Sequence, residues 1–237
     1  AESFNVSKDG DKSIVKVTYR FPQVDAQWEI TYKVFANGII KVDNRFVAEG
    51  TETPMIPRVG LRMQLSEILN DLTYYGRGPE ENYRDRRTSQ FIGEYTTPIK
   101  DLYEPYIRPQ ENEHRTDIYW CALTTKQKAG LLFIADRTFE LNASNYLLGS
   151  LDSGETIDNG APRTNETNHR HLTDPQPVKQ VDMFIDYRMM GVGGDNSWGA
   201  IAHEPYLIRP GVENAIEYGF SIVCLLYTSP SPRDAHE

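Results

Sequence analysis

The sequence has 237 residues and a formal net charge of −9, and its acidic and basic side chains are interspersed. This length fits one large all-β domain or two smaller domains, and it is enough to bury a sizeable core. No basic block is available to neutralise phosphates, which argues against a nucleic-acid partner. No apolar run reaches the ~18 residues that would span a membrane. Two cysteines, Cys121 and Cys224, are too few for a disulfide framework or a cysteine-rich metal site.

Apolar and polar residues alternate along most of the chain, which is the period of β strands. An Asn37-Gly38 turn between two alternating runs predicts a hairpin. No stretch carries an apolar stripe at helical spacing. The expected strands cover Val15–Phe21, Trp28–Val34, Ile40–Phe46, Val59–Leu65, Leu72–Tyr75, Thr116–Leu123, Leu131–Ala135, Phe139–Leu148, Val178–Met189 and Ala215–Val223.

These strands are joined by loops rich in glycine, proline and asparagine, a pattern that favours an all-β antiparallel sandwich. Several of them are longer than the usual ~5–6 residues, so large facing sheets fit better than a small immunoglobulin-like domain. No linker divides the pattern. We therefore expect one domain over residues 1–223.

Two polar loops stand out between the strands. In the first, Tyr74–Arg86, we expect arginine–carboxylate pairs to hold the backbone in place. The second, Tyr103–Arg115, is stiffened by prolines and presents Arg108, Glu111 and Asn112 as a polar edge. Such a rigid polar loop either braces a fold or lines the rim of a cleft.

A glycine-rich segment follows the strand that ends near Met189. Gly191, Gly193 and Gly194 permit close approach to the backbone, and they are followed by Asp195, Asn196, Ser197 and Trp198. An indole beside short polar side chains suits a sugar, because the ring packs on the apolar face of a pyranose while polar groups take its hydroxyls. The alternative is an ordinary turn whose tryptophan folds back into the core.

Other catalytic signatures are weak. His169 and His171 alternate, so they would share one face of a strand, but no third metal ligand can be placed. No nucleophile elbow or Ser/His/Asp set is visible. A retaining glycosidase needs two carboxylates held ~5–5.5 Å apart, and no pair of acidic residues marks such a site.

The two ends of the chain read differently from the rest. Ala1 is preceded by neither an initiator methionine nor a secretory signal, so we expect a piece of a longer protein whose compartment is left open. Residues 224–237 lack strand periodicity and read as a non-native, adaptor-like tail, and we leave them out of the fold prediction.

Four segments, read together, resemble one family. They are YYGRGPEENYRDRRTSQFIGEY, YEPYIRPQENEHRTDIYW, NHRH and MMGVGGDNSWGA, and their order and spacing resemble the C-terminal small domain of the multidomain β-galactosidases of glycoside hydrolase family 2. The resemblance covers roughly Phe4 to Val223. One departure is Glu113-His114, where the family usually has glycine or a small polar residue.

The resemblance implies an antiparallel super-sandwich related to galactose mutarotases, lying beside a (β/α)8 barrel that supplies both catalytic glutamates. It implies that this domain shapes the leaving-group subsite for a galactoside, with Trp198 stacking on sugar and Asp195, Asn196 and Ser197 holding its loop. Arg108, Glu111, Asn112, His171 and His203 are expected at the cleft rim.

No catalytic residue, metal ligand or cofactor is expected in this chain itself. For the whole enzyme the resemblance implies a divalent cation such as magnesium or calcium and allows a homo-oligomer. The compartment, bacterial cytoplasm or periplasm, is left open. Two alternatives stay open, a stand-alone carbohydrate-binding module and a mutarotase-like epimerase. The epimerase would need two histidines and a glutamate in one cleft, such as His169, His171 and Glu204.

Overall fold

The alternating segments form antiparallel strands in the computed structural model, which describes residues 1–48, 54–151, 171–196, 198–211 and 215–226. Eleven strands join into one continuous sheet within these described residues. The strands are β1 (Ser3–Asp9), β2 (Lys12–Phe21), β3 (Ala26–Val34), β4 (Ile40–Ala48), β5 (Arg58–Ser66), β6 (Asp71–Gly78), β7 (Phe91–Pro98), β8 (Arg115–Thr124), β9 (Gly130–Ser144), β10 (Gln180–Met189) and β11 (Ile216–Leu225).

The sheet branches at β9. Its main path runs β1-β2-β3-β4-β11-β9-β8-β6-β7, and β10 pairs with β9 and with β5 off this path. The first part of β9, residues 130–135, pairs with β11, whereas residues 140–144 pair with β10. Two strands therefore share one side of β9, and a seam opens where β9 leaves β11.

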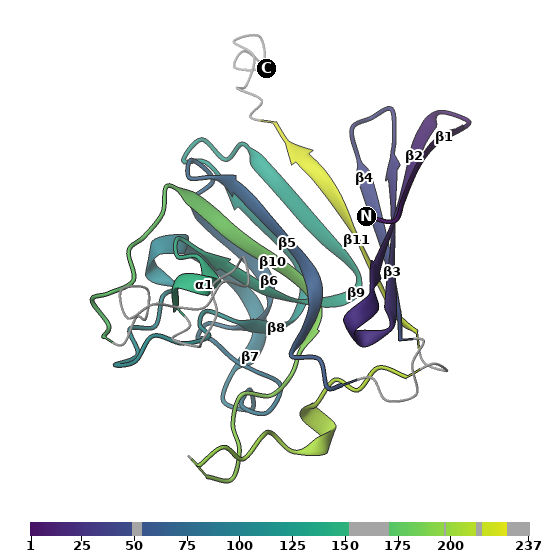
Figure 1. Ribbon diagram of the computed structural model, residues 1–237. Coiled ribbons are helices and arrows are strands. Elements are labelled where there is room, and N and C mark those ends of the chain that lie inside the picture. The colour runs from purple at the N-terminus through teal and green to yellow at the C-terminus, as the bar shows by residue number, and fades with distance from the viewer. Residues whose placement is uncertain (49–53, 152–170, 197, 212–214, 227–237) are drawn as a thin grey trace, which may run out of the picture.

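The two halves of the sheet face each other across the core (Figure 1). Ile30, Val42 and Phe220 come from the half that contains β3, β4 and β11, and they belong to the same buried cluster as Tyr74 and Ile185 from the other half. Burial of these apolar side chains, at ~25 cal/mol per Å² removed from water, drives the two layers together. The expected all-β antiparallel sandwich is confirmed.

Helical structure is short in the described part of the chain. It consists of one α-helical turn, α1 (Leu148–Leu151), and the 3-10 turns η1 (Pro22–Val24), η2 (Ile99–Asp101) and η3 (Glu204–Tyr206). No helix there is long and apolar enough to cross a membrane. The predicted Asn-Gly hairpin joins β3 to β4, where the Ile39 N–H donates to Asn37 Oδ1 at 3.1 Å and Gly38 has a left-handed φ of 84°.

Three details differ from the sequence prediction. Strands β1 and β7 were not predicted, because both are edge strands with few buried side chains. The two strands expected over 131–148 are one strand, β9, which ends at Ser144. Strand β11 continues to Leu225, so Cys224 and Leu225 pair with β9 and belong to the sheet. Most of the expected tail, 227–237, lies outside the described residues.

Candidate functional site

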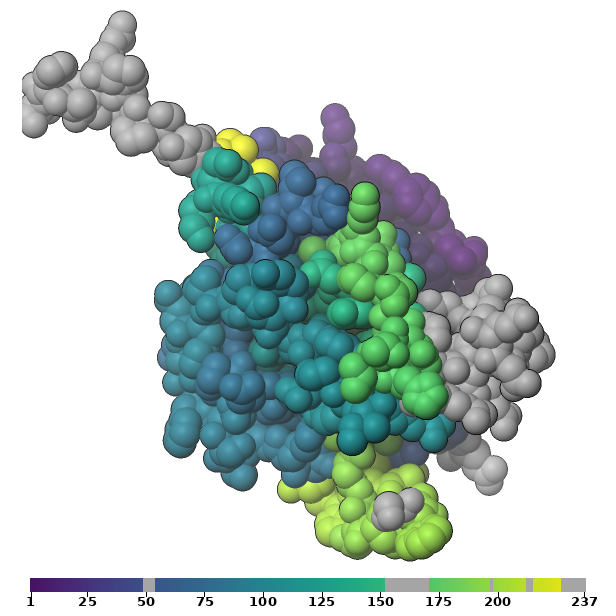
Figure 2. Space-filling view, turned by 90° about the vertical axis from the view of Figure 1, so that its left-hand side faces the viewer, coloured from purple at the N-terminus to yellow at the C-terminus, as the bar shows by residue number. Residues whose placement is uncertain are grey.

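Among the residues that the structure describes, the most exposed aromatic side chain lies on the segment that follows β10. We call residues 190–205 the Trp198 loop, and Figure 2 shows it projecting from the rest of the molecule. Trp198 is 91% exposed. The alternative in which this indole folds back into the core is therefore wrong, and the ring is free to contact a ligand or another part of a larger protein.

Short polar side chains hold the Trp198 loop. The Trp198 N–H donates to Asn196 Oδ1 at 2.8 Å, and His203 Nε2 lies 2.8 Å from Asp195 Oδ1 across the loop. Asp195, Asn196 and His203 thus lie together, and their contacts fix the loop backbone. Ser197, the remaining residue of the motif, lies outside the described residues.

The glycines of the loop serve close packing. A Cβ atom on Gly194 would lie 2.1 Å from the carbonyl oxygen of Ala200, and one on Gly191 would lie 2.8 Å from the Asp85 carboxyl carbon. Neither position has a left-handed φ, in contrast to Gly199 at +100°. The Gly193 N–H donates to Asp85 Oδ2 at 2.7 Å, which ties the loop to the segment after β6.

The predicted rim residues separate into buried and exposed groups. Asn112 is buried, and its side chain donates to Glu104 O at 2.6 Å and accepts from Glu104 N–H at 2.8 Å, so it braces its own loop. Glu111 faces inward to Arg58, at 2.8 Å. Arg108 and His171 are exposed. Asn112 and Glu111 are therefore structural, which corrects their expected place on an accessible rim.

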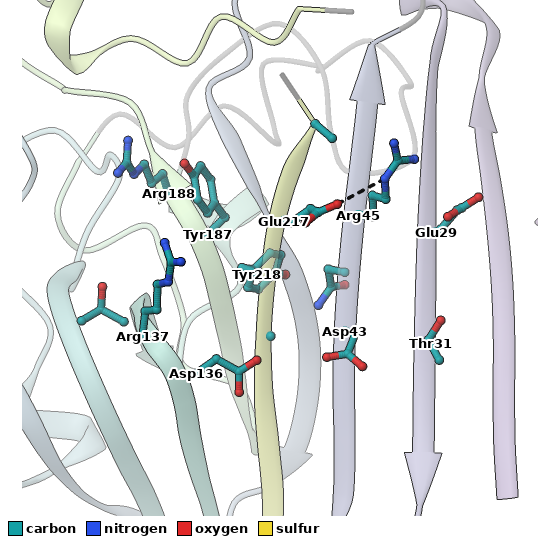
Figure 3. Close-up of a pocket in the computed structure, with 14 residues that line it drawn as sticks. Glu29, Thr31, Asp43, Arg45, Asp136, Arg137, Tyr187, Arg188, Glu217 and Tyr218 are labelled. Atoms are coloured by element: carbon teal, nitrogen blue, oxygen red, sulfur yellow. Dashed lines mark ion pairs between the residues drawn. The ribbon is translucent and has the colours of Figure 1, made fainter. Parts of the chain in front are cut away.

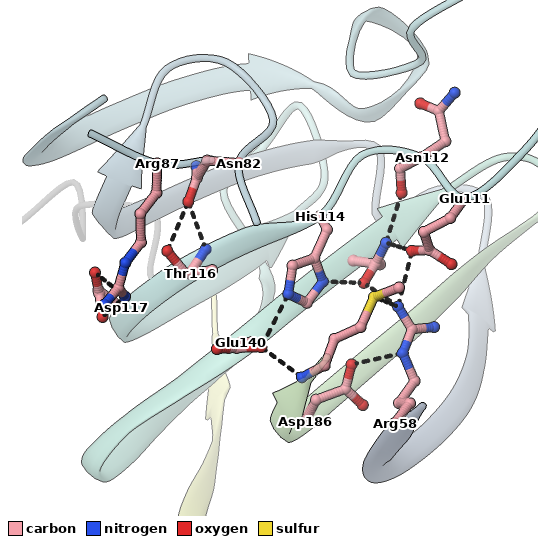
Figure 4. Close-up of polar contacts among 12 residues, drawn as sticks. Arg58, Asn82, Arg87, Glu111, Asn112, His114, Thr116, Asp117, Glu140 and Asp186 are labelled. Carbon is pink, nitrogen blue, oxygen red and sulfur yellow. Dashed lines mark hydrogen bonds and ion pairs between the residues drawn. The ribbon is translucent and has the colours of Figure 1, made fainter. Parts of the chain in front are cut away.

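Beneath this surface lies a set of buried polar side chains that the sequence did not reveal. We define it as the buried polar cluster: the buried side chains of His114, Glu140, Asn142 and Asp186 and the partly buried side chains of Arg58 and Glu111 (Figure 4). Arg58 Nε lies 3.1 Å from Asp186 Oδ2. Gly60 pairs with Asp186 across the strands, and a Cβ there would lie 1.7 Å from Asp186 Oδ1. A glycine at this position is what makes room for the carboxylate.

His114 is the centre of the buried polar cluster and is 0% exposed. Its Nδ1 lies 2.7 Å from Asn142 Oδ1 and its Nε2 lies 3.0 Å from Glu140 Oε2, while its ring stacks on Tyr83. Both ring nitrogens face acceptors, an arrangement that the doubly protonated imidazolium satisfies. Burial opposes that charge, but the hydrogen bond and attraction to Glu140 outweigh it, so the pKa of His114 is raised.

Burial also acts on two carboxyl groups near His114. It raises the pKa of Asp186 to about 7, against the opposing attraction of Arg58 and His114. It raises the pKa of Glu113 to about 8, against the hydrogen bond of Ser144 and attraction to Arg115. Glu113 also adopts a left-handed φ of 64°, a conformation that glycine takes easily. This fits its place where the resembling family usually has glycine or a small polar residue.

The buried polar cluster is connected to the Trp198 loop through the end of β10. Glu140 Oε2 accepts a hydrogen bond from the Met189 N–H at 2.6 Å, one residue before the loop begins. Because His114, Glu140 and Asp186 are buried, they cannot touch a substrate. They can hold the end of β10 in place.

The first polar loop is held by ion pairs, as predicted. Arg77 Nε lies 2.7 Å from Asp117 Oδ2, Arg87 lies 2.9 Å from the same carboxylate, and Arg86 pairs with Glu81. Asn82, fully buried, accepts hydrogen bonds from the Thr116 N–H and hydroxyl at 3.0 and 2.6 Å. This loop is a brace for β8.

The epimerase arrangement is not assembled by the described residues. Glu204 pairs with Arg209 at 2.8 Å on the surface, and the exposed His171 lies in a turn closed by Asp174. His169 lies outside the described residues. In the part of the chain that the structure describes, no three His, Cys, Asp or Glu side chains gather as a metal site. Cys121 is a buried free thiol.

Comparisons with known proteins agree with the resemblance. The chain is 31% identical over 212 residues to a β-galactosidase from Priestia megaterium, covering 84% of this chain and 19% of that protein. It is 30% identical over 214 residues to a β-galactosidase from Streptococcus thermophilus, covering 86% and 19%. The chain thus spans about a fifth of the length of these relatives.

Among solved structures, a galactose mutarotase related enzyme from Lactobacillus acidophilus aligns over 95% of this chain and 72% of its own, with 8% identity and a TM-score of 0.45. The family model described as the β-galactosidase small chain matches residues 1–222. The chain belongs to the β-galactosidase small-chain family.

Proposed function

We propose that this chain is the small-chain domain of a β-galactosidase and that it supplies Trp198 to the leaving-group subsite. The observation that carries the proposal is the 91% exposure of this indole on a braced loop. An isolated exposed tryptophan has no structural role in the sheet. A flat ring of this kind packs well on the apolar face of a pyranose, with ~0.5–1.5 kcal/mol beyond the area it buries.

In this proposal the loop residues position the ring rather than react. Asp195 contacts His203, and Asn196 accepts from the Trp198 N–H. Bond cleavage then belongs to the remainder of the parent protein, where an acid/base glutamate and a nucleophile glutamate would hydrolyse terminal β-galactosides with retention. Magnesium or calcium belongs, in this proposal, to that remainder as well.

Exposed apolar side chains give this chain a surface on which the remainder can dock. Besides Trp198, Phe91 is 73% exposed and Ile107 is 85% exposed. Where such side chains form a contiguous patch in a soluble protein, they commonly mark an interaction site. We expect the isolated chain to self-associate, and a monodisperse monomer at high concentration in analytical ultracentrifugation would contradict the docking role.

Complementation tests the proposed function. Lactose hydrolysis is measured for this chain alone, for the remainder of the parent alone, and for the two mixed. We expect no hydrolysis by this chain and recovery of activity, or a clear increase, on mixing. Lactose cleavage by the purified chain alone would overturn the proposal, and so would full activity of the remainder with unchanged inhibition by glucose.

A further inference from the structure

The two layers of the sandwich end at different places on the side of β5. One layer contains β11, β4, β3, β2 and β1 in this order, and we call it the β1 layer. The other layer ends at β5, whose Val59 belongs to a buried cluster with Ala26 of β3 and Phe46 of β4. Among the described residues, neither this cluster nor the main buried cluster includes a side chain of β1 or β2. Strands β2 and β1 therefore extend past the edge of the facing layer (Figure 1).

The inner face of the β1 layer stays apolar beyond that edge. Phe4, Val17 and Ile30 lie side by side across β1, β2 and β3, and their exposed fractions are 68%, 8% and 3%. The neighbouring row ends in the same way, since Val6, opposite Val15, is 59% exposed. We call the apolar side chains of β1 and β2 on this face the overhang: Phe4, Val6, Val15, Val17, Tyr19 and Phe21.

The outer face of the same layer is polar. In Figure 3, Glu29 of β3, Asp43 of β4 and Glu217 of β11 are among the side chains that line a hollow on this face. On β1 the outward positions are Ser3, Asn5, Ser7 and Asp9. The outer face thus suits water, whereas a contiguous apolar patch such as the overhang marks a contact surface.

A free strand edge lies beside the overhang. Strand β5 has nine residues, and the side of β5 that faces away from β10 has no partner strand among the described residues. Leu61, Met63 and Leu65 of β5 pack against the main buried cluster but remain only partly buried. Proteins seldom leave a long apolar edge of this kind open, because it pairs with other chains. An added strand would find here both a backbone edge to pair with and an apolar face to cover.

The free edge narrows the choice of occupant. A small molecule or a lipid surface would cover the apolar side chains but leave N–H and C=O groups of the β5 edge without partners, which is costly. A second copy of this chain fits poorly, because the apolar faces of its β5 and β10 already pack on its own β3 and β4. An extended segment of polypeptide satisfies the edge by strand pairing and the overhang by burial.

We propose that an extended segment of the parent β-galactosidase, from outside these 237 residues, pairs with the free edge of β5 and packs apolar side chains on the overhang. Such polypeptide is available, because the chain spans about a fifth of the length of its relatives. The overhang is two strands wide, at ~4.8 Å per strand, so it accommodates one or two added strands. This inference rests on the proposed origin of the chain in a longer enzyme and not on the role of Trp198.

Cysteine labelling of the 237-residue chain and of the full-length enzyme tests the proposal. Val6→Cys lies on the overhang, and Ser7→Cys is its control, because the next residue of the same exposed strand faces the opposite way. Both are made with Cys224→Ser, since Cys224 is exposed and Cys121 is buried. Reaction with a maleimide is read by mass spectrometry on the peptide that carries the new cysteine.

The expected result depends on the face of β1. In the dilute isolated chain both cysteines should react rapidly. In the full-length enzyme only Val6→Cys should slow, by about tenfold or more, because it then reacts only when the added strand opens. Galactoside hydrolysis by the full-length variants confirms that they fold.

Hydrogen exchange tests the pairing of β5 itself. We expect the amides of residues 58–66 to exchange more slowly in the full-length enzyme than in the isolated chain, because the free edge gains hydrogen-bond partners. The amides of β10 are the control and should change less, since β10 already pairs with β5 and β9 on its two sides.

Four results would overturn the proposal. They are equal labelling rates of Val6→Cys in the two proteins, equal slowing of both cysteines, slow labelling of Val6→Cys in the dilute isolated chain, and unchanged exchange in β5. Slowing that appears in the isolated chain only as its concentration rises, and reaches the full-length level, would assign the overhang to a second copy instead. None of these readouts involves glucose or complementation, so they fail or succeed independently of the Trp198 subsite.

Discussion

The buried polar cluster and the Trp198 loop meet at the end of β10 and have opposite environments. Met189, whose N–H is held by Glu140, is 8% exposed, and Trp198, nine residues later, is 91% exposed. The cluster concentrates charges where water cannot reach them, and the loop places a large apolar ring in water. The difference teaches that an exposed ring can be presented from a strand end that buried side chains hold in place.

The largest expected loss of stability comes from removing a charged side chain of the buried polar cluster. Arg58→Ala would leave Asp186 and Glu111 without their cation. Removing one partner from a buried ion pair typically costs ~3–5 kcal/mol, because the remaining charge is uncompensated. We expect the free energy of unfolding in urea to fall by about that amount. A loss smaller than ~1 kcal/mol would show that the cluster contributes no more than a surface pair.

The pH dependence of stability probes the same buried region. Glu113 has a pKa raised from 4.5 to about 8, so the folded chain holds a proton that the unfolded chain releases. This stabilising contribution is complete below pH 4.5 and is lost as pH rises through about 8. In Glu113→Gln it is absent, so the unfolding free energy of the variant relative to wild type should rise across that range.

Chemical denaturation at several pH values measures this difference. Glu67→Gln, at an exposed turn, is the control and should follow the wild-type curve. Parallel curves for Glu113→Gln and wild type would mean that Glu113 does not titrate in this window.

The shape of the Trp198 loop can be changed without touching the indole. A Cβ on Gly194 would lie 2.1 Å from a backbone oxygen, whereas one on Gly193 would lie 3.3 Å from the end of the Asp85 side chain. We expect Gly194→Ala in the full-length enzyme to weaken glucose binding severalfold and Gly193→Ala to change it little. Glucose inhibition constants measure this, and equal effects would argue against a shape-dependent subsite.

The smallest effect is expected at an exposed ion pair. Arg209 and Glu204 pair at 2.8 Å in solvent, where hydration and salt weaken the attraction. Arg209→Ala should therefore leave the urea midpoint within experimental error, in contrast to Arg58→Ala. A clear drop in the midpoint would show that surface pairs near the loop matter more than burial predicts.

Most of the sheet could be predicted from the sequence, because alternation reports directly which side of a strand meets the core. Edge strands are harder to predict from the sequence, because few of their side chains are buried. β1 carries Phe4 and Val6, which are exposed, so its pattern is not reinforced by burial. The short polar link at 136–138 likewise read as a break in the pattern, whereas β9 runs through it.

The Trp198 loop was predicted from its motif, because all its residues are adjacent in the chain. The buried polar cluster could not be predicted in this way, because Arg58 contacts Glu111 and Asn142, which lie 53 and 84 positions further along the chain. Glycine at position 60 was one local signal, because a glycine inside an alternating strand indicates close approach by another group. Which group approaches depends on the register between β5 and β10.

The most direct test of the account is the affinity for glucose of the full-length enzyme carrying Trp198→Ala. If the indole stacks on the sugar in the leaving-group subsite, the variant should bind glucose at least severalfold more weakly. The rate of galactoside bond cleavage should change less. Unchanged glucose affinity would contradict the role of Trp198.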